Sequence, residues 1–245
     1  MLRDTIQKMI QKEKFNPRIL GFFINYNFLI RKSIFTSIQR NASQLSGSLL
    51  DFGCGTKPYK SLFNKVKEYK GIDFKIEGRK DNYSQVDQFY DGKTIPFPKA
   101  TFDSVLCTEV LEHVFNIDEV LQEINRVLKL NGKVLITTPF MWEEHEMPYD
   151  FARYTTPALL FLYQKNGFKV IDNFKTGNYI EVIFQFSLNY IKNILPANKY
   201  IRQLFLFPFI FIFNFFGLVF SFLLPVDTTA YFNNVFLLEK IENIS

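Results

Sequence analysis

The stretch LLDFGCG at residues 49–55 decides how this chain folds. A short apolar run ends there in a turn with two glycines, and an acidic residue closes the sequence YKGID at residues 69–73. In open α/β sheets, a strand, a glycine turn and a carboxylate about 20 residues further on form a nucleoside pocket, because glycines allow close backbone approach and the carboxylate accepts ribose hydroxyls. The spacing therefore predicts a nucleoside pocket with Asp73 at its rim.

Around this stretch, short apolar runs alternate with helical periods from Ser48 onward. Such alternation is typical of repeated βα units, so the chain is predicted to be an α/β protein. Asn131-Gly132 is expected to end one helix, and Thr156-Pro157 to begin another with the threonine as its cap. We expect helices at residues 1–40, 59–66, 118–130 and 156–166, and strands at residues 48–52, 69–73, 83–87, 102–108, 133–138, 168–174 and 231–239.

Composition and charge narrow the functional classes. The 245 residues carry a formal net charge of +5, and no segment interleaves basic and aromatic residues as a single-strand nucleic-acid platform does. We therefore expect no nucleic-acid partner. The two cysteines, Cys54 and Cys107, are too few for a disulfide framework, and the N-terminus lacks a cleavable apolar stretch. These features predict a protein of the reducing cytoplasm.

Six ordered motifs carry a family resemblance. The chain resembles class I S-adenosylmethionine-dependent methyltransferases of the type 11 methyltransferase-domain group over roughly residues 45 to 175. The resemblance implies a Rossmann-like, doubly wound seven-stranded sheet with its last strand antiparallel. The motifs are LLDFGCGT (49–56), GID (71–73), IPFP (95–98), FDSVLC (102–107), EVLEHV (109–114) and RVLKLNG (126–132).

By this resemblance S-adenosylmethionine is the cofactor. The amides of residues 53–56 would meet its methionine portion, Asp73 the ribose hydroxyls and Asp87 the adenine amine, although Asp81 and Asp91 compete for that last role. A carboxylate that accepts two hydroxyls forms strong charge-assisted bonds, which suits Asp73. The implied cofactor-binding residues are Asp51, which would steady the loop, Gly53, Cys54, Gly55, Thr56, Asp73 and Asp87, with Thr108 and Glu109 beside the sulfonium.

One departure from the family pattern points to a subgroup. Many relatives have a third glycine where this chain has Lys57-Pro58-Tyr59. Similar Lys-Pro-Tyr endings occur in methyltransferases associated with bacterial surface polysaccharides. The resemblance therefore implies a small-molecule or lipid-linked sugar as the acceptor.

The two histidines of the chain are candidates for acceptor chemistry. His113 opens the segment after the fourth strand, where a structural hydrogen bond is an alternative to catalysis. His145 lies after the fifth strand, at the edge of the sheet where such folds bind ligands. We interpret His145 as a general base and Arg153 as a clamp on the acceptor, whereas a loop pinned by an Asp150–Arg153 salt bridge would need neither role. We expect no metal, because the two histidines stand in separate motifs without ligand spacing.

A long apolar insertion separates the sixth and seventh strands. Residues 203–226 contain no charged residue, and 30 of the 245 residues are phenylalanines, many of them in the last quarter. The segment at residues 204–224 is long enough to span a bilayer, but both ends of the insertion must return to one sheet, and Pro208, Asn214 and Gly217 suit a bent or monotopic element. The insertion is therefore interpreted as membrane-associated on the inner face of the cell membrane. A buried cap or a homodimer interface is the alternative.

Together, these interpretations predict the domain organisation and the function of the chain. We expect an N-terminal helical segment at residues 1–44, a methyltransferase domain at residues 45–179 and 226–245, and the insertion at residues 180–225. The basic N-terminal segment is interpreted either as a brace over the domain or as a membrane-surface element. The chain is predicted to O-methylate a membrane-linked glycan or glycolipid precursor. The alternatives are a quinone or lipid head-group methyltransferase and a non-catalytic scaffold.

Overall fold

The computed structural model describes residues 9–10, 12–75 and 83–244. The chain forms two compact units. The helical unit combines the N-terminal part up to Thr36 with Lys175–Phe232, and the sheet unit combines Ser37–Phe174 with Asn233–Ser245. This division differs from the three segments expected from the sequence, because the N-terminal helices pack with the apolar insertion. Asp81 and the start of the basic N-terminal segment lie outside the described residues.

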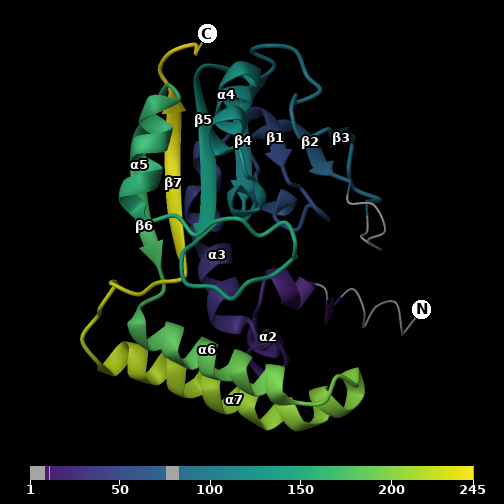
Figure 1. The fold of residues 1–245 in the computed structure, drawn as a ribbon, viewed down its shortest axis with the longest axis vertical. Helices are drawn as coiled ribbons and strands as arrows, with labels where there is room; N and C mark the ends of the chain where they lie inside the picture. Colours follow the sequence, from purple (N-terminus) through teal and green to yellow (C-terminus); the bar gives the residue numbers. More distant parts are fainter. Residues whose placement is uncertain (1–8, 11, 76–82, 245) are drawn as a thin grey trace. The chain divides into compact units, whose positions relative to one another are not determined.

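The sheet has seven strands in the order β3-β2-β1-β4-β5-β7-β6, which confirms the predicted Rossmann-like fold (Figure 1). β1, β2, β3, β4 and β5 run parallel, and β7 pairs antiparallel with β5. The carboxyl ends of β1, β2 and β4 therefore meet at one edge. The strands are β1 (Gly47–Phe52), β2 (Val66–Phe74), β3 (Gln88–Tyr90), β4 (Phe102–Thr108), β5 (Leu128–Pro139), β6 (Phe168–Thr176) and β7 (Asn233–Lys240).

Alternate side chains of the central strands form the core on one face of the sheet. Leu50, Val105 and Val134 are fully buried there and pack in the same cluster as residues of α4 (Ile117–Val127) and α5 (Thr156–Lys165). The last residues of α3 (Phe28–Asn41), from Ser37 onward, belong to the sheet unit, and Ile38 among them is fully buried. Successive residues of the central strand β4, such as Val105, Leu106 and Cys107, are buried, as expected where both faces are covered, whereas burial alternates along β6.

Three local expectations were wrong. The third strand lies at β3 and not at residues 83–87, and the helix expected at 59–66 shrinks to the 3₁₀ turn η2 (Lys60–Leu62). α4 ends at Val127, so Asn131-Gly132 lies within β5 rather than at a helix end. The other 3₁₀ turns of the described residues are η1 (Ala42–Gln44) and η3 (Leu111–His113).

The start of α5 shows how a small shift changes the capping residue. The helix begins at Thr156 as predicted, but the side chain of Thr155, and not of Thr156, accepts the N–H of Ala158 at 3.4 Å. Thr156 instead donates its hydroxyl to Asn234 on β7 at 2.7 Å. Thr155 therefore caps the helix, and the adjacent Thr156 connects the helix to the sheet.

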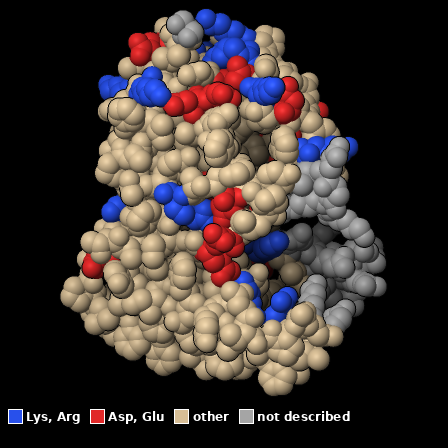
Figure 2. All heavy atoms as spheres, in the orientation of Figure 1, with Lys and Arg blue, Asp and Glu red and all other residues tan. Residues whose placement is uncertain are grey.

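The helical unit consists of α2 (Ile19–Ile24), the first turns of α3, α6 (Tyr179–Ile194) and α7 (Lys199–Leu223). α6 and α7 lie side by side as a hairpin in Figure 1, joined by ring contacts of Phe184 with Phe213 and Phe220. Figure 2 shows almost no charge over these two helices. Within the described residues, one helix, Ile201–Leu223, is long and apolar enough to cross a membrane, and 22% of its most apolar window is buried.

Candidate cofactor and acceptor site

The glycine turn after β1 has the backbone shape that the sequence predicts. Gly53 and Gly55 have φ values of +74° and +49°, which L-residues with side chains rarely adopt. A Cβ atom at Gly53 would lie 2.2 Å from Val110, so the turn can pass there only without a side chain. A Cβ at Gly55 would meet nothing within 4 Å. The turn therefore presents bare backbone to open space at Gly55.

Asp73 lies at the end of β2 and faces this turn. Its Oδ2 accepts the N–H of Gly55 at 2.8 Å, and its Oδ1 accepts the N–H of Phe74 at 2.8 Å. A carboxylate offers about four acceptor positions, so ribose hydroxyls can add to these two bonds. The carboxylate of Asp73 can bind the ribose of a nucleoside, and the open backbone at Gly55 can approach an anionic chain attached to it. This is the arrangement of nucleoside sites in open α/β sheets.

Asp87 ties the same turn from the other side. Its Oδ2 accepts the Gly71 N–H at 2.6 Å and pairs with the ammonium of Lys57, whose side chain is only 6% exposed. Although burial opposes it, these bonds hold the pKa of Asp87 below its ordinary value. Asp87 therefore anchors Lys57 beside the turn, and its contact with an adenine amine stays a prediction.

Asp51 is the buried support of the turn. Its side chain is 3% exposed, and the hydroxyl of Tyr69 donates to its Oδ2 at 2.6 Å. Burial raises the pKa of Asp51 to about 7, and the hydrogen bond from Tyr69 only partly offsets that effect. Cys54 is neutral at physiological pH, since burial raises the pKa of its thiol to about 12. Thr56 is exposed on the same turn.

Glu109 holds the end of β4 in a strained conformation. Its φ is +54°, and its N–H donates to the carbonyl of Thr137 at 3.0 Å. Oε1 accepts the hydroxyl of Thr137 at 2.7 Å, and Oε2 accepts the amide of Asn233 at 2.8 Å. Thr108, the preceding residue, is paired in register with Thr137. β5 and β7 therefore position the two residues predicted to lie beside the sulfonium.

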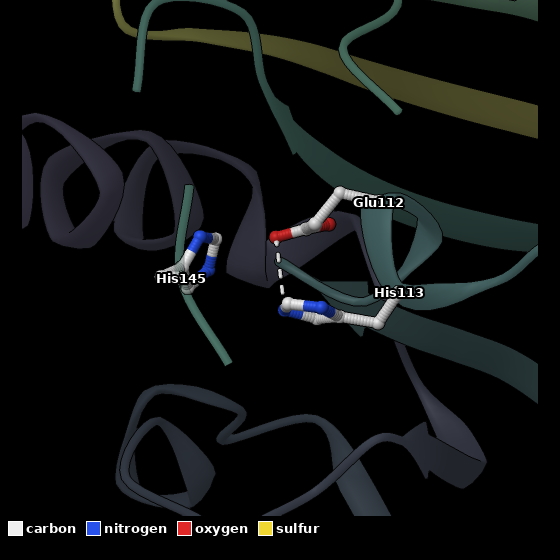
Figure 3. Close-up of side chains that lie close together, drawn as sticks. All are labelled: Glu112, His113 and His145. Atoms are coloured by element: carbon white, nitrogen blue, oxygen red, sulfur yellow. Dashed lines mark ion pairs between the residues drawn. The ribbon is translucent and has the colours of Figure 1, made fainter. Parts of the chain in front are cut away.

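Both histidines lie next to a buried carboxylate. Glu112 and His113 come from η3, and His145 faces them from the loop after β5 (Figure 3). One ligand atom of each residue lies within 4.8 Å of the others, and the imidazole rings meet edge to face with centroids 4.8 Å apart. Burial, with the neighbouring charge of Glu109, raises the pKa of Glu112 well above its ordinary value. Burial and His113 lower the pKa of His145, which is therefore uncharged at neutral pH.

Arg153 pins the loop that carries His145. The salt bridge that was considered as the alternative to an acceptor clamp is present: Arg153 Nη1 lies 2.6 Å from Asp150 Oδ1, and Nη2 lies 2.8 Å from Oδ2. Burial opposes ionisation of Asp150, but the bonds from Arg153 and from the N–H of His145 lower its pKa to about 2. The structure does not favour the acceptor clamp, because each N–H of the guanidinium already has an acceptor. Besides Asp150, the acceptors are the carbonyls of Trp142, Glu143 and Ala152, and Nδ1 of His145 lies 3.4 Å from Nη2.

Sequence reasoning missed several residues that build the site. Glu112 was overlooked although it directly precedes His113, and its proximity to His145 joins two segments that are far apart in sequence. The expectation of no metal rested on ligand spacing, and that argument fails because the loop after β5 brings His145 back to η3. Tyr69, Thr137 and Asn233 carried no motif that would have pointed to them.

Solved structures confirm the fold. The [4+2]-cyclase SpnF superimposes with a TM-score of 0.55 and 18% identity, covering 85% of this chain and 81% of that chain. A phosphoethanolamine N-methyltransferase of Haemonchus contortus, solved with S-adenosylhomocysteine, gives a TM-score of 0.51 and 17% identity, covering 94% of this chain and 59% of that one. These likenesses concern the fold alone, and SpnF is a reminder that the fold does not dictate the reaction.

Two curated relatives resemble the chain in sequence. An uncharacterised protein of Methanocaldococcus jannaschii is 28% identical over 168 residues, which cover 63% of this chain and 70% of the relative. A demethylmenaquinone methyltransferase of Bacillus licheniformis is 28% identical over 131 residues, which cover 48% of this chain and 56% of the relative. The family model described as methyltransferase domain matches residues 26–179, more than half of the 245 residues, and the chain therefore belongs to the methyltransferase domain family.

Proposed function

We propose that this protein is an S-adenosylmethionine-dependent methyltransferase that acts on a membrane-linked acceptor. The observation that carries the proposal is the open backbone face of Gly55 beside the carboxylate of Asp73. Gly53 and Gly55 would hold the methionine portion of the cofactor, and Asp73 its ribose. Family membership supports the same reaction class.

His145 is the proposed base for the acceptor hydroxyl. Bound S-adenosylmethionine supplies an electrophilic methyl group on a sulfonium whose leaving thioether is neutral. The acceptor must then be held in line and lose its proton as its oxygen bonds to the methyl carbon. An uncharged imidazole can take that proton, and the lowered pKa keeps His145 uncharged at neutral pH.

The exposed surface of α7 supports a membrane-linked acceptor. Phe222 is 88% exposed and Leu204 is 74% exposed on a helix with few charged residues. A core helix of a water-soluble protein would bury most of its apolar residues, whereas this helix leaves many of them uncovered. Insertion of one face of α6 and α7 into the interface of a bilayer would remove that surface from water.

Buried polar residues in the same unit support this interpretation. Gln185 and Asn189 on α6 and Asn214 on α7 are each 1% exposed or less. The Gln185 amide donates to the carbonyl of Tyr26 at 2.8 Å, and that of Asn214 donates to the carbonyl of Phe22 at 2.9 Å. This hairpin buries polar residues and exposes apolar ones, which is the reverse of the pattern in a water-soluble hairpin. In membranes, side-chain amides commonly form hydrogen bonds between helices.

The proposed acceptor is a hydroxyl of a membrane-linked glycan or glycolipid precursor, on the strength of the Lys57-Pro58-Tyr59 resemblance. A quinone ring is the second candidate, favoured by the similarity to a demethylmenaquinone methyltransferase. Incubation with methyl-labelled cofactor and either a polyprenyl-linked sugar or a demethylated quinol separates the two. Label in the sugar supports the first candidate, and label in the quinol alone overturns it.

The cofactor site is tested by calorimetric titration with S-adenosylhomocysteine. We expect Asp73→Asn to weaken binding by roughly 1.5–3 kcal/mol, the free energy of a hydrogen bond to a charged group. Asp103→Asn is the matched control, because Asp103 also accepts a backbone N–H, from Ser48 at 2.9 Å, but lies at the opposite edge of the sheet. Equal affinity of wild type and Asp73→Asn would remove the ribose assignment. A folded wild type that does not bind would favour the scaffold alternative.

A further inference from the structure

Glu112 is an unpartnered buried carboxylate aimed at two imidazoles. The residue is 0% exposed, and neither carboxylate oxygen has a hydrogen-bond partner. Oε1 lies 3.7 Å from Nε2 of His113, which is too far for a hydrogen bond. The dashed line in Figure 3 marks this pair. Burying an ionisable group without a partner is costly, so this arrangement calls for a ligand between the side chains.

The hydrogen bonds of the two histidines direct their remaining nitrogens to that ligand. Nδ1 of His113 lies 2.7 Å from the carbonyl of Tyr149, which can only accept, so Nδ1 carries the proton and Nε2 keeps its lone pair. Nδ1 of His145 lies 3.3 Å from both the carbonyl of Glu143 and the carboxylate of Asp150, and 3.4 Å from Nη2 of Arg153, so this ring nitrogen is held by its own loop. Metal-ligating histidines are fixed in this way by an acceptor on the other ring nitrogen.

The charges around the cluster favour a cation. The carboxylate of Asp150 lies 3.3 Å from Nδ1 of His145, and Glu109 comes from the same segment after β4 as Glu112. The guanidinium of Arg153 donates to Asp150 and to carbonyls of its own loop rather than to Glu112. A divalent ion would satisfy the buried carboxylate of Glu112, whose two oxygens have no hydrogen-bond partner.

We propose that Glu112, His113 and His145 bind a divalent first-row transition-metal ion. Two imidazoles and one carboxylate form a ligand set that suits such ions and leaves coordination positions open, whereas Mg²⁺ and Ca²⁺ prefer oxygen ligands alone. An open position could bind the acceptor oxygen and stabilise its deprotonated form, a task otherwise assigned to His145. That role rests on the proposed function, whereas binding of the ion does not.

The test uses full-length, tag-free protein, stripped with a chelator and titrated with Co²⁺ while its visible absorption is recorded. We expect one Co²⁺ per chain with the spectrum of imidazole and carboxylate ligation. Glu112→Gln and His145→Asn should each weaken binding at least about 100-fold, since loss of even an outer-shell partner costs about 10–100-fold. Glu144→Gln is the matched control, because Glu144 is an exposed carboxylate next to His145 and should leave binding unchanged.

S-adenosylhomocysteine titration and thermal unfolding of the same samples verify that each variant is folded. His145→Asn is the milder variant, since His145 is 30% exposed whereas Glu112 is fully buried. Absence of Co²⁺ binding in a wild type that binds S-adenosylhomocysteine would overturn the metal site and leave the proposed function standing. Equal Co²⁺ affinity in all variants would also overturn it. Binding of one Co²⁺ per chain without binding of S-adenosylhomocysteine would support the proposed metal site and contradict the proposed methyltransferase function.

Discussion

At the scale of single residues, Asp51 is expected to make the folding stability of the protein depend on pH. Its carboxyl is buried beneath Gly53 and Gly55, and its folded pKa of about 7 exceeds the model-peptide value of 3.8. The folded state therefore binds this proton more tightly than the unfolded state does. Its contribution to stability is fully present below pH about 4 and is lost as the pH rises through about 7.

Replacing Asp51 by Asn should remove this pH dependence. The asparagine oxygen can still accept the hydroxyl of Tyr69, but the side chain no longer titrates. Between pH about 4 and 7 the wild type should lose up to about 4 kcal/mol of unfolding free energy that the variant retains. Urea unfolding at several pH values measures the difference.

Asp103→Asn provides a control of opposite sign. The bond from Lys129 lowers the pKa of Asp103, so the wild type should lose stability relative to this variant only as the pH falls below about 4. Parallel pH curves for wild type and Asp51→Asn would show that Asp51 is not buried as a neutral acid.

Residues in motifs could be predicted, whereas residues brought together by loops could not. Asp73 was placed correctly at a strand end beside the glycine turn, because a strand, a turn and a second strand are local in sequence. The cluster of Glu112 with His145 depends on where the loop after β5 folds back, which no local pattern encodes. Arg153 shows the same limit: its salt bridge with Asp150 was considered only as an alternative to the acceptor clamp, and the use of its N–H groups within the loop was not predicted.

At the scale of elements, burial explains which predictions succeeded. β4 has the predicted bounds Phe102–Thr108, because its apolar run VLC at residues 105–107 is buried in the centre of a parallel sheet. β3 was misplaced because an edge strand of three residues, QFY, has too little apolar pattern to be located. Element ends were least predictable where a turn, such as the one at Asn131, lies inside a strand.

The apolar surface of α7 predicts a vesicle-binding defect. Phe222→Asp should weaken binding to anionic phospholipid vesicles roughly 10–150-fold, because burying a phenylalanine side chain contributes about 1.5–3 kcal/mol. Sedimentation with vesicles measures the affinity. Phe161→Asp on α5 is the matched control: Phe161 is 67% exposed, yet it belongs to the sheet unit, so this variant should sediment as the wild type does.

The alternatives for this surface give different results. A homodimer interface would make Phe222→Asp monomeric in the absence of lipid, with no wild-type sedimentation. Equal sedimentation of all three proteins would place the membrane contact outside α7.

At the scale of the whole molecule, the two units should respond differently to lipid. Hydrogen exchange should slow in α6 and α7 when vesicles are added, since insertion removes solvent from their exposed face. Exchange in β1, β4 and β5 should stay unchanged, because these strands are buried within the sheet unit. The same peptides without vesicles serve as the reference. Protection that rises equally in both units would indicate general stabilisation rather than local insertion.

The position of β7 in the sheet constrains how the protein can be made. β7 lies between β5 and β6, yet it follows α6 and α7 along the chain. During translation the ribosome therefore releases the apolar hairpin while the sheet still has a gap, with an edge of β5 unpaired. Unpaired strand edges and exposed apolar surface are hazards for nascent chains. Early insertion of the hairpin into a bilayer would remove its apolar surface from water before β7 is synthesised. The edge of β5 would then be paired once Asn233 and the rest of β7 follow.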